Sequence, residues 1–137
     1  MAENFNEKVI AEFRANEGKV GGFFDGQTLL LLHTTGAKTG AERINPLVYQ
    51  RVGDAYAIFA SNGGGQSDPQ WYRNLTKHPD TTVEVGTATI AVRARVADAD
   101  ERAPIWARQA AELDNFAGYE KSAAPREIPV VILDPAA

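Results

Sequence analysis

Residues 28–50, TLLLLHTTGAKTGAERINPLVYQ, decide the fold prediction for this chain. Residues 28–35 resemble a strand, and their unbroken leucines predict burial on both faces. Residues 36–40 form a turn bracketed by glycines. Residues 43–50 are extended again, and Pro46 within them indicates a sheet edge or a bulge. Two strands joined by a short turn predict an antiparallel hairpin.

Patterns outside this hairpin predict further strands and helices. The additional strands are expected at residues 55–61, 81–85, 87–96 and 128–133. Helices are expected at residues 5–17, from an N-cap at Asp68 to before Pro79, and from near Asp98 or Asp100 through Ala117. About six mostly antiparallel strands with three or so flanking helices predict an α+β barrel in one domain, residues 1–137. A doubly wound parallel sheet is disfavoured because strands and helices do not alternate.

Composition excludes several classes of function. The chain has no cysteine among its 137 residues, which excludes thiol chemistry and thiolate metal sites and is consistent with a reducing, cytoplasmic location. A formal charge of −4 argues against binding nucleic acid, which usually needs a basic face. The sequence shows no apolar run long enough to span a bilayer, and with only two histidines no metal site is expected.

The turn at residues 36–40 is the first candidate binding site. Lys38 and the hydroxyl of Thr39 lie inside it, and Arg43 follows shortly after. Backbone N–H groups of such a turn can form an anion nest, and the two cations could bind a phosphate. The alternative is a tight hairpin with solvated charges. It is not a P-loop, because the turn leads into a strand rather than a helix.

A second candidate is the segment of residues 60–71, ASNGGGQSDPQW. Consecutive glycines are costly in ordered backbone unless a ligand must approach closely. They join a strand end to a helix N-terminus, and Ser61 and Asn62 could hydrogen-bond a planar heterocycle. The alternative is a flexible linker.

Other residues admit a structural interpretation. His33 lies in an apolar strand, and we expect it to be a packed or rim histidine rather than a catalytic base. Trp71 and Trp106 follow helical apolar stripes typical of a core. Phe116 and Tyr119, near the end of the last helix, could face a pocket or pack in the core.

The order of these segments resembles the deazaflavin-dependent nitroreductase and quinone reductase family, whose members use reduced coenzyme F420. Four blocks carry the resemblance over nearly the whole chain: LLLLHTTGAKTGAERINPL (residues 29–47), FASNGGGQSDPQWYRNL (59–75), HPDTTVEV (78–85) and REIPVVIL (126–133). The resemblance implies a split β-barrel related to flavin-mononucleotide-binding barrels. It also implies hydride transfer from the cofactor to a quinone, an activated alkene or a nitroaromatic compound.

The resemblance also implies roles for individual residues. The phosphate would contact Lys38, Thr39 and Arg43, and Phe116 and Tyr119 would line the substrate side. Tyr119 is the candidate proton donor and Ser61 a candidate polariser, although water could serve equally well. The expected neighbours of the deazaflavin ring are Pro46, Ala60, Ser61, Asn62, Gly63 and Trp71.

This chain departs from the family pattern at two positions. Ala37 stands where the family often has Arg, and Asn62 where it often has Lys. Both departures remove a cation near the phosphate or the acidic tail of the cofactor. The expectation is weaker cofactor affinity, or a tail held by Arg14, Lys19 or Arg51.

Two alternatives to the F420-dependent reductase stay open. One is a related barrel enzyme that uses flavin mononucleotide (FMN), and the other is a non-catalytic module that binds a flavin or deazaflavin. A small-molecule substrate is expected in the enzymatic cases, and the acceptor itself is open. A homodimer is the candidate assembly, because barrels of related folds often dimerise.

Overall fold

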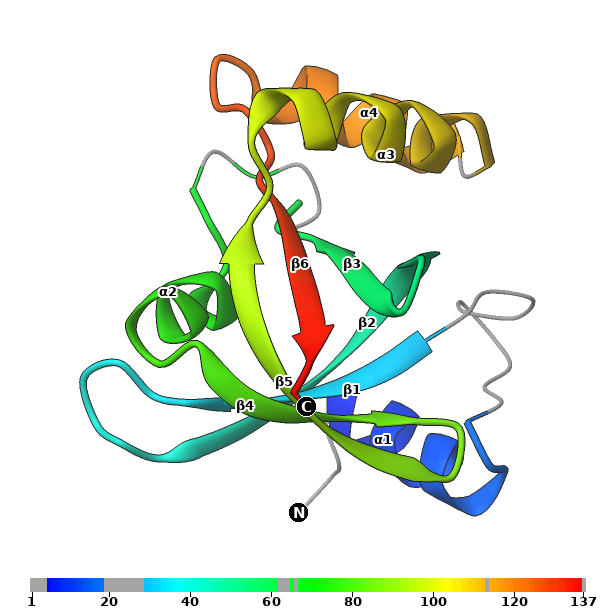
Figure 1. Ribbon diagram of the computed structural model, residues 1–137, viewed down its shortest axis with the longest axis vertical. Helices are drawn as coiled ribbons and strands as arrows, with labels where there is room; N and C mark the ends of the chain where they lie inside the picture. The colour runs from blue at the N-terminus through cyan, green and yellow to red at the C-terminus, as the bar shows by residue number, and fades with distance from the viewer. Residues whose placement is uncertain (1–4, 19–28, 62–64, 66, 113, 137) are drawn as a thin grey trace.

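The computed structural model of the protein describes residues 5–18, 29–61, 65, 67–112 and 114–136. Within this part of the chain, six strands close into a barrel in the order β1-β2-β3-β6-β5-β4, and every neighbouring pair is antiparallel (Figure 1). The strands are β1 (Leu29–Thr35), β2 (Glu42–Val52), β3 (Ala55–Phe59), β4 (Asp80–Val85), β5 (Ala88–Val96) and β6 (Val130–Pro135). The predicted α+β barrel of antiparallel strands is confirmed.

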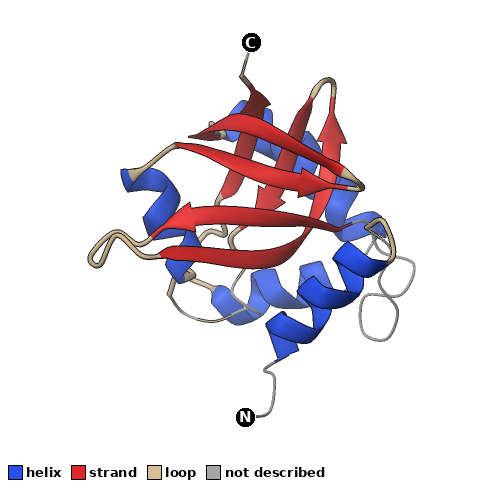
Figure 2. Ribbon diagram, turned by 90° about the horizontal axis from the view of Figure 1, so that it is seen from below, coloured by secondary structure: helices blue, strands red, loops and turns tan. Residues whose placement is uncertain are grey.

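Helices cover the barrel from several sides (Figure 2). The described helices are α1 (Phe5–Ala15), α2 (Gln70–Lys77), α3 (Ala99–Glu112) and α4 (Asp114–Ala123). Figure 1 shows α3 and α4 together at one end of the barrel. The single helix expected between Asp98 and Ala117 is therefore wrong in extent, since the chain forms two helices there. Asp and Asn at the start of the second are poor residues for a helix interior.

The leucine run of β1 is buried on both faces, as predicted. Leu30 and Leu32 point into the barrel, whereas Leu29 and Leu31 pack under α1 against Phe13. Strand side chains alternate between faces, so one continuous apolar run fills two cores. A third core joins α3 and α4 to the outer side of β3 and β6.

Pro46 lies where β2 opens away from β3. The register pairs Pro46 with Leu31 of β1, whereas the pairing of β2 with β3 extends only from Tyr49 to Val52. Proline cannot donate a ladder hydrogen bond, so it suits a strand segment with one neighbour. The sheet edge predicted at Pro46 is confirmed locally, because this part of β2 pairs with β1 alone.

Several element boundaries differ by one or more residues from the sequence prediction, and two of the differences have a clear physical reason. The N-cap of α2 is Pro69, with no side-chain cap, so the prediction that Asp68 caps this helix is wrong. The Asp68 carboxylate instead accepts a hydrogen bond from Arg126 at 2.9 Å. Strand β6 begins at Val130 rather than at residue 128, because Pro129 has no N–H to donate to a ladder.

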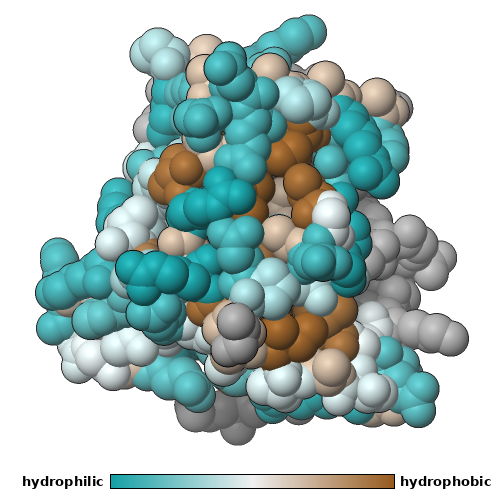
Figure 3. Space-filling model, viewed as in Figure 1, coloured by the Kyte–Doolittle hydropathy of each residue, from teal (hydrophilic) through white to brown (hydrophobic). Residues whose placement is uncertain are grey.

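The face of the molecule seen in Figure 1 is mostly hydrophilic, with hydrophobic groups in separate patches between polar side chains (Figure 3). Among the residues whose burial is described, Val96 is the large hydrophobic residue that stands exposed, at 49%. No helix in the described ranges combines the length and the apolarity that a membrane span requires.

Candidate functional site

A groove of about 860 Å³ lies at the opening between β2 and β3. Its walls come from four places in the chain: α1, the first half of β2, the end of β3 and the start of α2. The lining residues are Glu7, Ile10, Glu42, Arg43, Ile44, Asn45, Pro46, Leu47, Phe59, Ser61, Pro69, Gln70, Trp71 and Asn74. This volume is within the range of about 300–1,000 Å³ typical of small-molecule sites.

The groove brings together four of the residues predicted from the sequence to contact a cofactor. They are Arg43, Pro46, Ser61 and Trp71. Pro46 and Trp71 are buried and provide apolar walls, Ser61 is half-buried, and the Arg43 side chain is exposed. Ala60 is fully buried behind the lining, at 0% exposure. Asn62 and Gly63 lie outside the described residues.

The glycine-bracketed turn is closed by its own hydrogen bonds. The Gly36 N–H donates to the Ala41 carbonyl at 2.7 Å, and the Gly40 N–H donates to the Gly36 carbonyl at 2.9 Å. The Ala41 N–H donates to the Thr39 hydroxyl at 3.2 Å, and the Ala37 N–H donates to the side chain of Asn74. These four amides are therefore not available to bind an anion.

Lys38 and Thr39 are both exposed on this turn and do not line the groove. Arg43 is thus the predicted phosphate ligand that the fold places at the groove itself. Two of the cations suggested for the cofactor tail are engaged elsewhere: Arg14 pairs with Glu84, and Arg51 lies over the Tyr56 ring.

Asn74 is a buried polar residue that sequence reasoning missed. Its side chain is 1% exposed, accepts from the Ala37 N–H at 3.0 Å and donates to the Thr34 hydroxyl at 3.1 Å. One turn further along α2, the Lys77 ammonium donates to the Ala37 carbonyl at 2.7 Å. Helix α2 therefore fixes the position of the turn beside the groove. The available signal was the helical spacing of Asn74 from Trp71, which puts both on one face.

The aromatic residues expected on the substrate side belong to a core cluster. Phe116 is 6% exposed and packs edge-on against Phe59 and Trp106, with ring centroids 5.4 and 6.0 Å away. Tyr119 packs against Phe116 at 5.3 Å. Neither Phe116 nor Tyr119 lines the groove, but Phe59 does. Phe59, which sequence reasoning missed, is the aromatic that connects this cluster to the groove.

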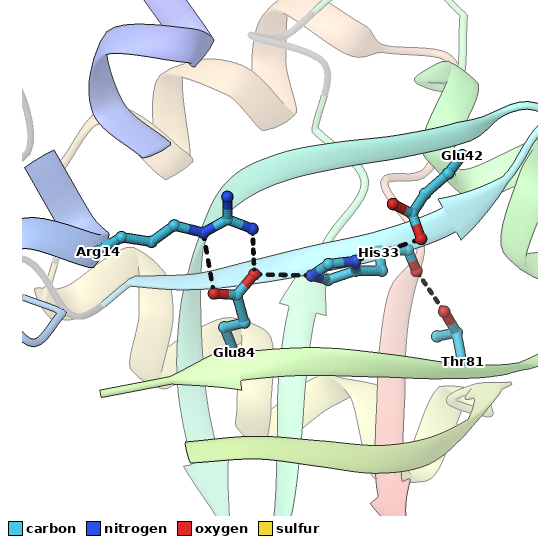
Figure 4. A network of polar contacts seen from close by, with 5 residues as sticks. All are labelled: Arg14, His33, Glu42, Thr81 and Glu84. Carbon is cyan, nitrogen blue, oxygen red and sulfur yellow. Dashed lines mark hydrogen bonds and ion pairs between the residues drawn. The ribbon is translucent and has the colours of Figure 1, made fainter. Parts of the chain in front are cut away.

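His33 takes part in a charged network on the outer face of the barrel (Figure 4). Its Nε2 lies 2.7 Å from the Glu84 carboxylate, which also accepts two hydrogen bonds from Arg14 at 2.7 and 3.1 Å. Its Nδ1 lies 3.7 Å from Glu42, and its carbonyl accepts from the Thr81 hydroxyl. His33 is thus a rim residue, as predicted, and it contacts two carboxylates.

Glu84 is the centre of this network. The hydrogen bonds from Arg14, which outweigh the opposing effect of burial, and the contact with His33 hold the pKa of the Glu84 carboxyl below its ordinary value. The network joins the last turn of α1 to β1 and β4. It therefore anchors the helix whose residues Glu7 and Ile10 form one wall of the groove.

Comparison with known proteins supports one family. Residues 6–135 match the model of the family described as F420H(2)-dependent quinone reductase. The chain belongs to this family. An F420H(2)-dependent quinone reductase of Mycobacterium tuberculosis (strain H37Rv) is 41% identical over 128 residues, which cover 90% of this chain and 85% of that protein.

Solved structures agree with this quinone reductase family. The structure of an F420-H2 dependent reductase (FDR-A) superimposes with a TM-score of 0.70 at 33% identity, over 77% of this chain and 93% of that one. Another, reported as a domain-swapped dimer, gives a TM-score of 0.72 at 30% identity over 93% of both chains. The predicted split β-barrel of the FMN-binding type is confirmed.

Proposed function

We propose that this member of the F420H(2)-dependent quinone reductase family is an oxidoreductase. It transfers a hydride from reduced F420 to a quinone, an activated alkene or a nitroaromatic acceptor. The observation that carries this proposal is the groove beside the first half of β2, which gathers Arg43, Pro46, Ser61 and Trp71 from three separate segments. Family membership supports the choice of cofactor.

The groove lining suits a flat, phosphorylated heterocycle. Pro46, Trp71 and Phe59 are buried apolar groups that would cover a ring and exclude water, whereas Ser61 offers polar atoms. Arg43 offers a guanidinium that can bind a phosphate with two hydrogen bonds. Glu42 also lines the groove, but its side chain is 71% exposed, so solvent screens its repulsion of an anion.

The chemistry that the bound cofactor supplies is hydride donation from its C5 carbon. The protein contributes binding and orientation: Arg43 holds the phosphate end, with Lys38 and Thr39 adding charge and a hydroxyl from the neighbouring turn. Ser61 would polarise the ring or the acceptor, and the buried Ala60 would support Ser61 from behind the groove lining. Tyr119 and Phe116 shape the substrate side through Phe59, and a proton reaches the reduced acceptor from Tyr119 or water.

A steady-state assay tests the proposed function. Purified protein should oxidise reduced F420 in the presence of quinones, activated alkenes or nitroaromatics, followed by the absorbance of the oxidised deazaflavin. Binding of F420 without turnover of any acceptor would favour a non-catalytic module. Binding of FMN in preference to F420 would favour the flavin alternative.

The chain's two tryptophans allow binding to be assigned to the groove. Trp71 lines the groove, whereas Trp106, a residue of α3, packs in the core cluster between that helix and the barrel. In a Trp106→Phe variant, F420 should still quench the remaining tryptophan fluorescence. In the matched Trp71→Phe variant, most of the quenching should be lost. Equal quenching in both variants would place the cofactor elsewhere.

We further propose a homodimer that works in the cytoplasm. The relative reported as a domain-swapped dimer supports the dimer. The absence of cysteine from the sequence is consistent with a reducing compartment. Sedimentation equilibrium should give twice the mass of one chain, and a single-chain mass at micromolar concentration would contradict the dimer.

A further inference from the structure

Arg126 connects the segment after α4 to the glycine-rich segment before α2. Its guanidinium donates to the carbonyl oxygens of Ala60 at 3.1 Å, Ser61 at 3.0 Å and Gly65 at 2.8 and 3.2 Å. It also donates to the Asp68 carboxylate at 2.9 Å. The Arg126 side chain is 14% exposed, so solvent competes little with these bonds.

This arrangement uses the shape of arginine as well as its charge. A guanidinium presents five N–H donors in one rigid plane, and here they reach three carbonyls and a carboxylate spread over residues 60–68. Glycine-rich backbone loses much conformational entropy when it is ordered. Several bonds from one rigid, buried group are a means of holding the described residues of this segment in one conformation.

The contact with Ala60 also sets the direction of a donor at the groove. In a trans peptide the C=O and the following N–H point in opposite directions. Because the Ala60 carbonyl points at Arg126, the N–H of Ser61 points away from Arg126. Ser61 lines the groove.

We propose that Arg126 is a positioning residue for the cofactor ring: it orients the Ala60–Ser61 peptide so that Ser61 presents its N–H to the ring edge. The proposal rests on the proposed function, which assigns Ser61 to the ring. Arg126 itself does not line the groove, so it acts through the segment that it holds.

Arg102 provides a matched control. Its side chain is 13% exposed, donates to the Ile128 carbonyl at 3.0 Å and lies 5.0 Å from the Trp106 ring centroid. Arg102 is as buried as Arg126, but the residues that it contacts here, Ile128, Glu127 and Trp106, lie outside the glycine-rich segment. Lysine at either position keeps the charge and loses the planar fork.

The test compares Arg126→Lys with Arg102→Lys and the unchanged protein. We expect Arg126→Lys to weaken F420 binding at least about 10-fold by Trp71 quenching, the scale of a lost charged hydrogen bond. The F420 affinity of Arg102→Lys should stay within about 2-fold of that of the unchanged protein. This should hold even if Arg102→Lys lowers the melting temperature as much as Arg126→Lys does. The absorption band of bound F420 should also shift in Arg126→Lys alone, because that band reports hydrogen bonds to the ring.

Amide hydrogen exchange gives a readout without cofactor. Measured residue by residue by NMR, exchange at Ser61 and Gly65 should be faster in Arg126→Lys and unchanged in Arg102→Lys. If Arg126→Lys does not fold, Asp68→Asn replaces it, with an expected loss of affinity of about 3-fold because one of the anchoring bonds weakens.

Two results would overturn the proposal: unchanged F420 affinity in Arg126→Lys, or equal effects of Arg126→Lys and Arg102→Lys. Failure of the proposed function would look different, since the unchanged protein would then not bind F420. In that case the exchange comparison decides whether Arg126 holds the segment. Unchanged exchange at Ser61 and Gly65 in Arg126→Lys would refute the positioning role of Arg126. Faster exchange in Arg126→Lys but not in Arg102→Lys would support that role.

Discussion

At the scale of single residues, Arg43 and Lys38 belong to one predicted phosphate site but lie in different places. Arg43 lines the groove, whereas Lys38 is exposed on the turn outside the lining. We expect Arg43→Ala to weaken F420 binding by roughly 1.5–3 kcal/mol, the usual loss of a charge-assisted hydrogen bond. Lys38→Ala should weaken F420 binding by less than Arg43→Ala does, because solvent screens a charge that lies further from the groove. Fluorescence titration at low salt measures both.

Arg108→Ala is the control for the general effect of removing a positive charge. Arg108 is exposed on α3 and pairs with Glu112 at 3.0 Å. Its removal should leave F420 affinity unchanged. If Arg43→Ala and Arg108→Ala bind F420 equally well, the phosphate does not contact Arg43.

Tyr119 illustrates a residue whose role depends on its neighbours. Its ring packs edge-on against Phe116, which in turn contacts the groove residue Phe59. This placement favours shaping of the substrate side over proton donation. We expect Tyr119→Phe to retain its turnover rate, and Tyr119→Ala to raise the Michaelis constant for bulky quinones. A fall in kcat of about 100-fold in Tyr119→Phe, with unchanged F420 affinity, would instead identify a general acid.

At the scale of elements, the end of α1 meets the β4–β5 hairpin through two glycines. Gly18 has φ +94°, and a Cβ there would lie 2.9 Å from the Gly86 Cα. Gly18→Ala therefore combines an unfavourable backbone conformation with a steric overlap. We expect it to lower the free energy of unfolding by about 2–4 kcal/mol, measured by urea denaturation.

Gly53→Ala separates the two contributions. Gly53 also has a positive φ, +60°, but nothing lies within 4 Å of a Cβ placed there. Gly53→Ala should lower the free energy of unfolding by about 1 kcal/mol, which is the cost of the left-handed conformation alone. Equal losses in the two variants would show that α1 and the hairpin do not pack closely.

At the scale of the whole molecule, the Glu84 network predicts how stability depends on pH. Arg14 and His33 lower the pKa of Glu84 in the folded protein relative to the unfolded chain, where it is about 4.3. The stabilisation is therefore fully present above that value and is lost as pH falls through the lower folded pKa. We expect the free energy of unfolding to decrease below about pH 4.3, and Glu84→Gln to make this decrease shallower.

Glu120→Gln is the matched control, because Glu120 is exposed on α4. The free energy of unfolding of Glu120→Gln should depend on pH in the same way as that of the unchanged protein. If Glu84→Gln behaves in the same way, the ion pair between α1 and β4 contributes nothing to acid stability. That result would also remove the network as the anchor of the groove wall.

Local sequence patterns were enough to predict the strands and turns of the barrel, and four sequence blocks were enough to indicate the family. Leu29–Leu32 fill two cores because strand side chains alternate, and Gly86 turns the β4–β5 hairpin because its φ of +58° suits glycine. These features depend on neighbouring residues, so local patterns suffice to predict them. Among the candidate site residues, Arg43 and Ser61 belong to motifs that indicated a ligand by themselves, whereas Pro46 and Trp71 were assigned to the site by the family resemblance.

The motifs do not predict which of those residues share a groove or what positions them, because both depend on the folded chain. Asp68 resembles a helix cap in the sequence, yet its carboxylate bonds to Arg126, 58 residues away. Asn74 resembles an ordinary helical residue, yet it holds Ala37, 37 residues away. Such partners depend on how the barrel closes, since a buried polar group must bond to whatever the topology brings beside it. No spacing within a single motif encodes that choice.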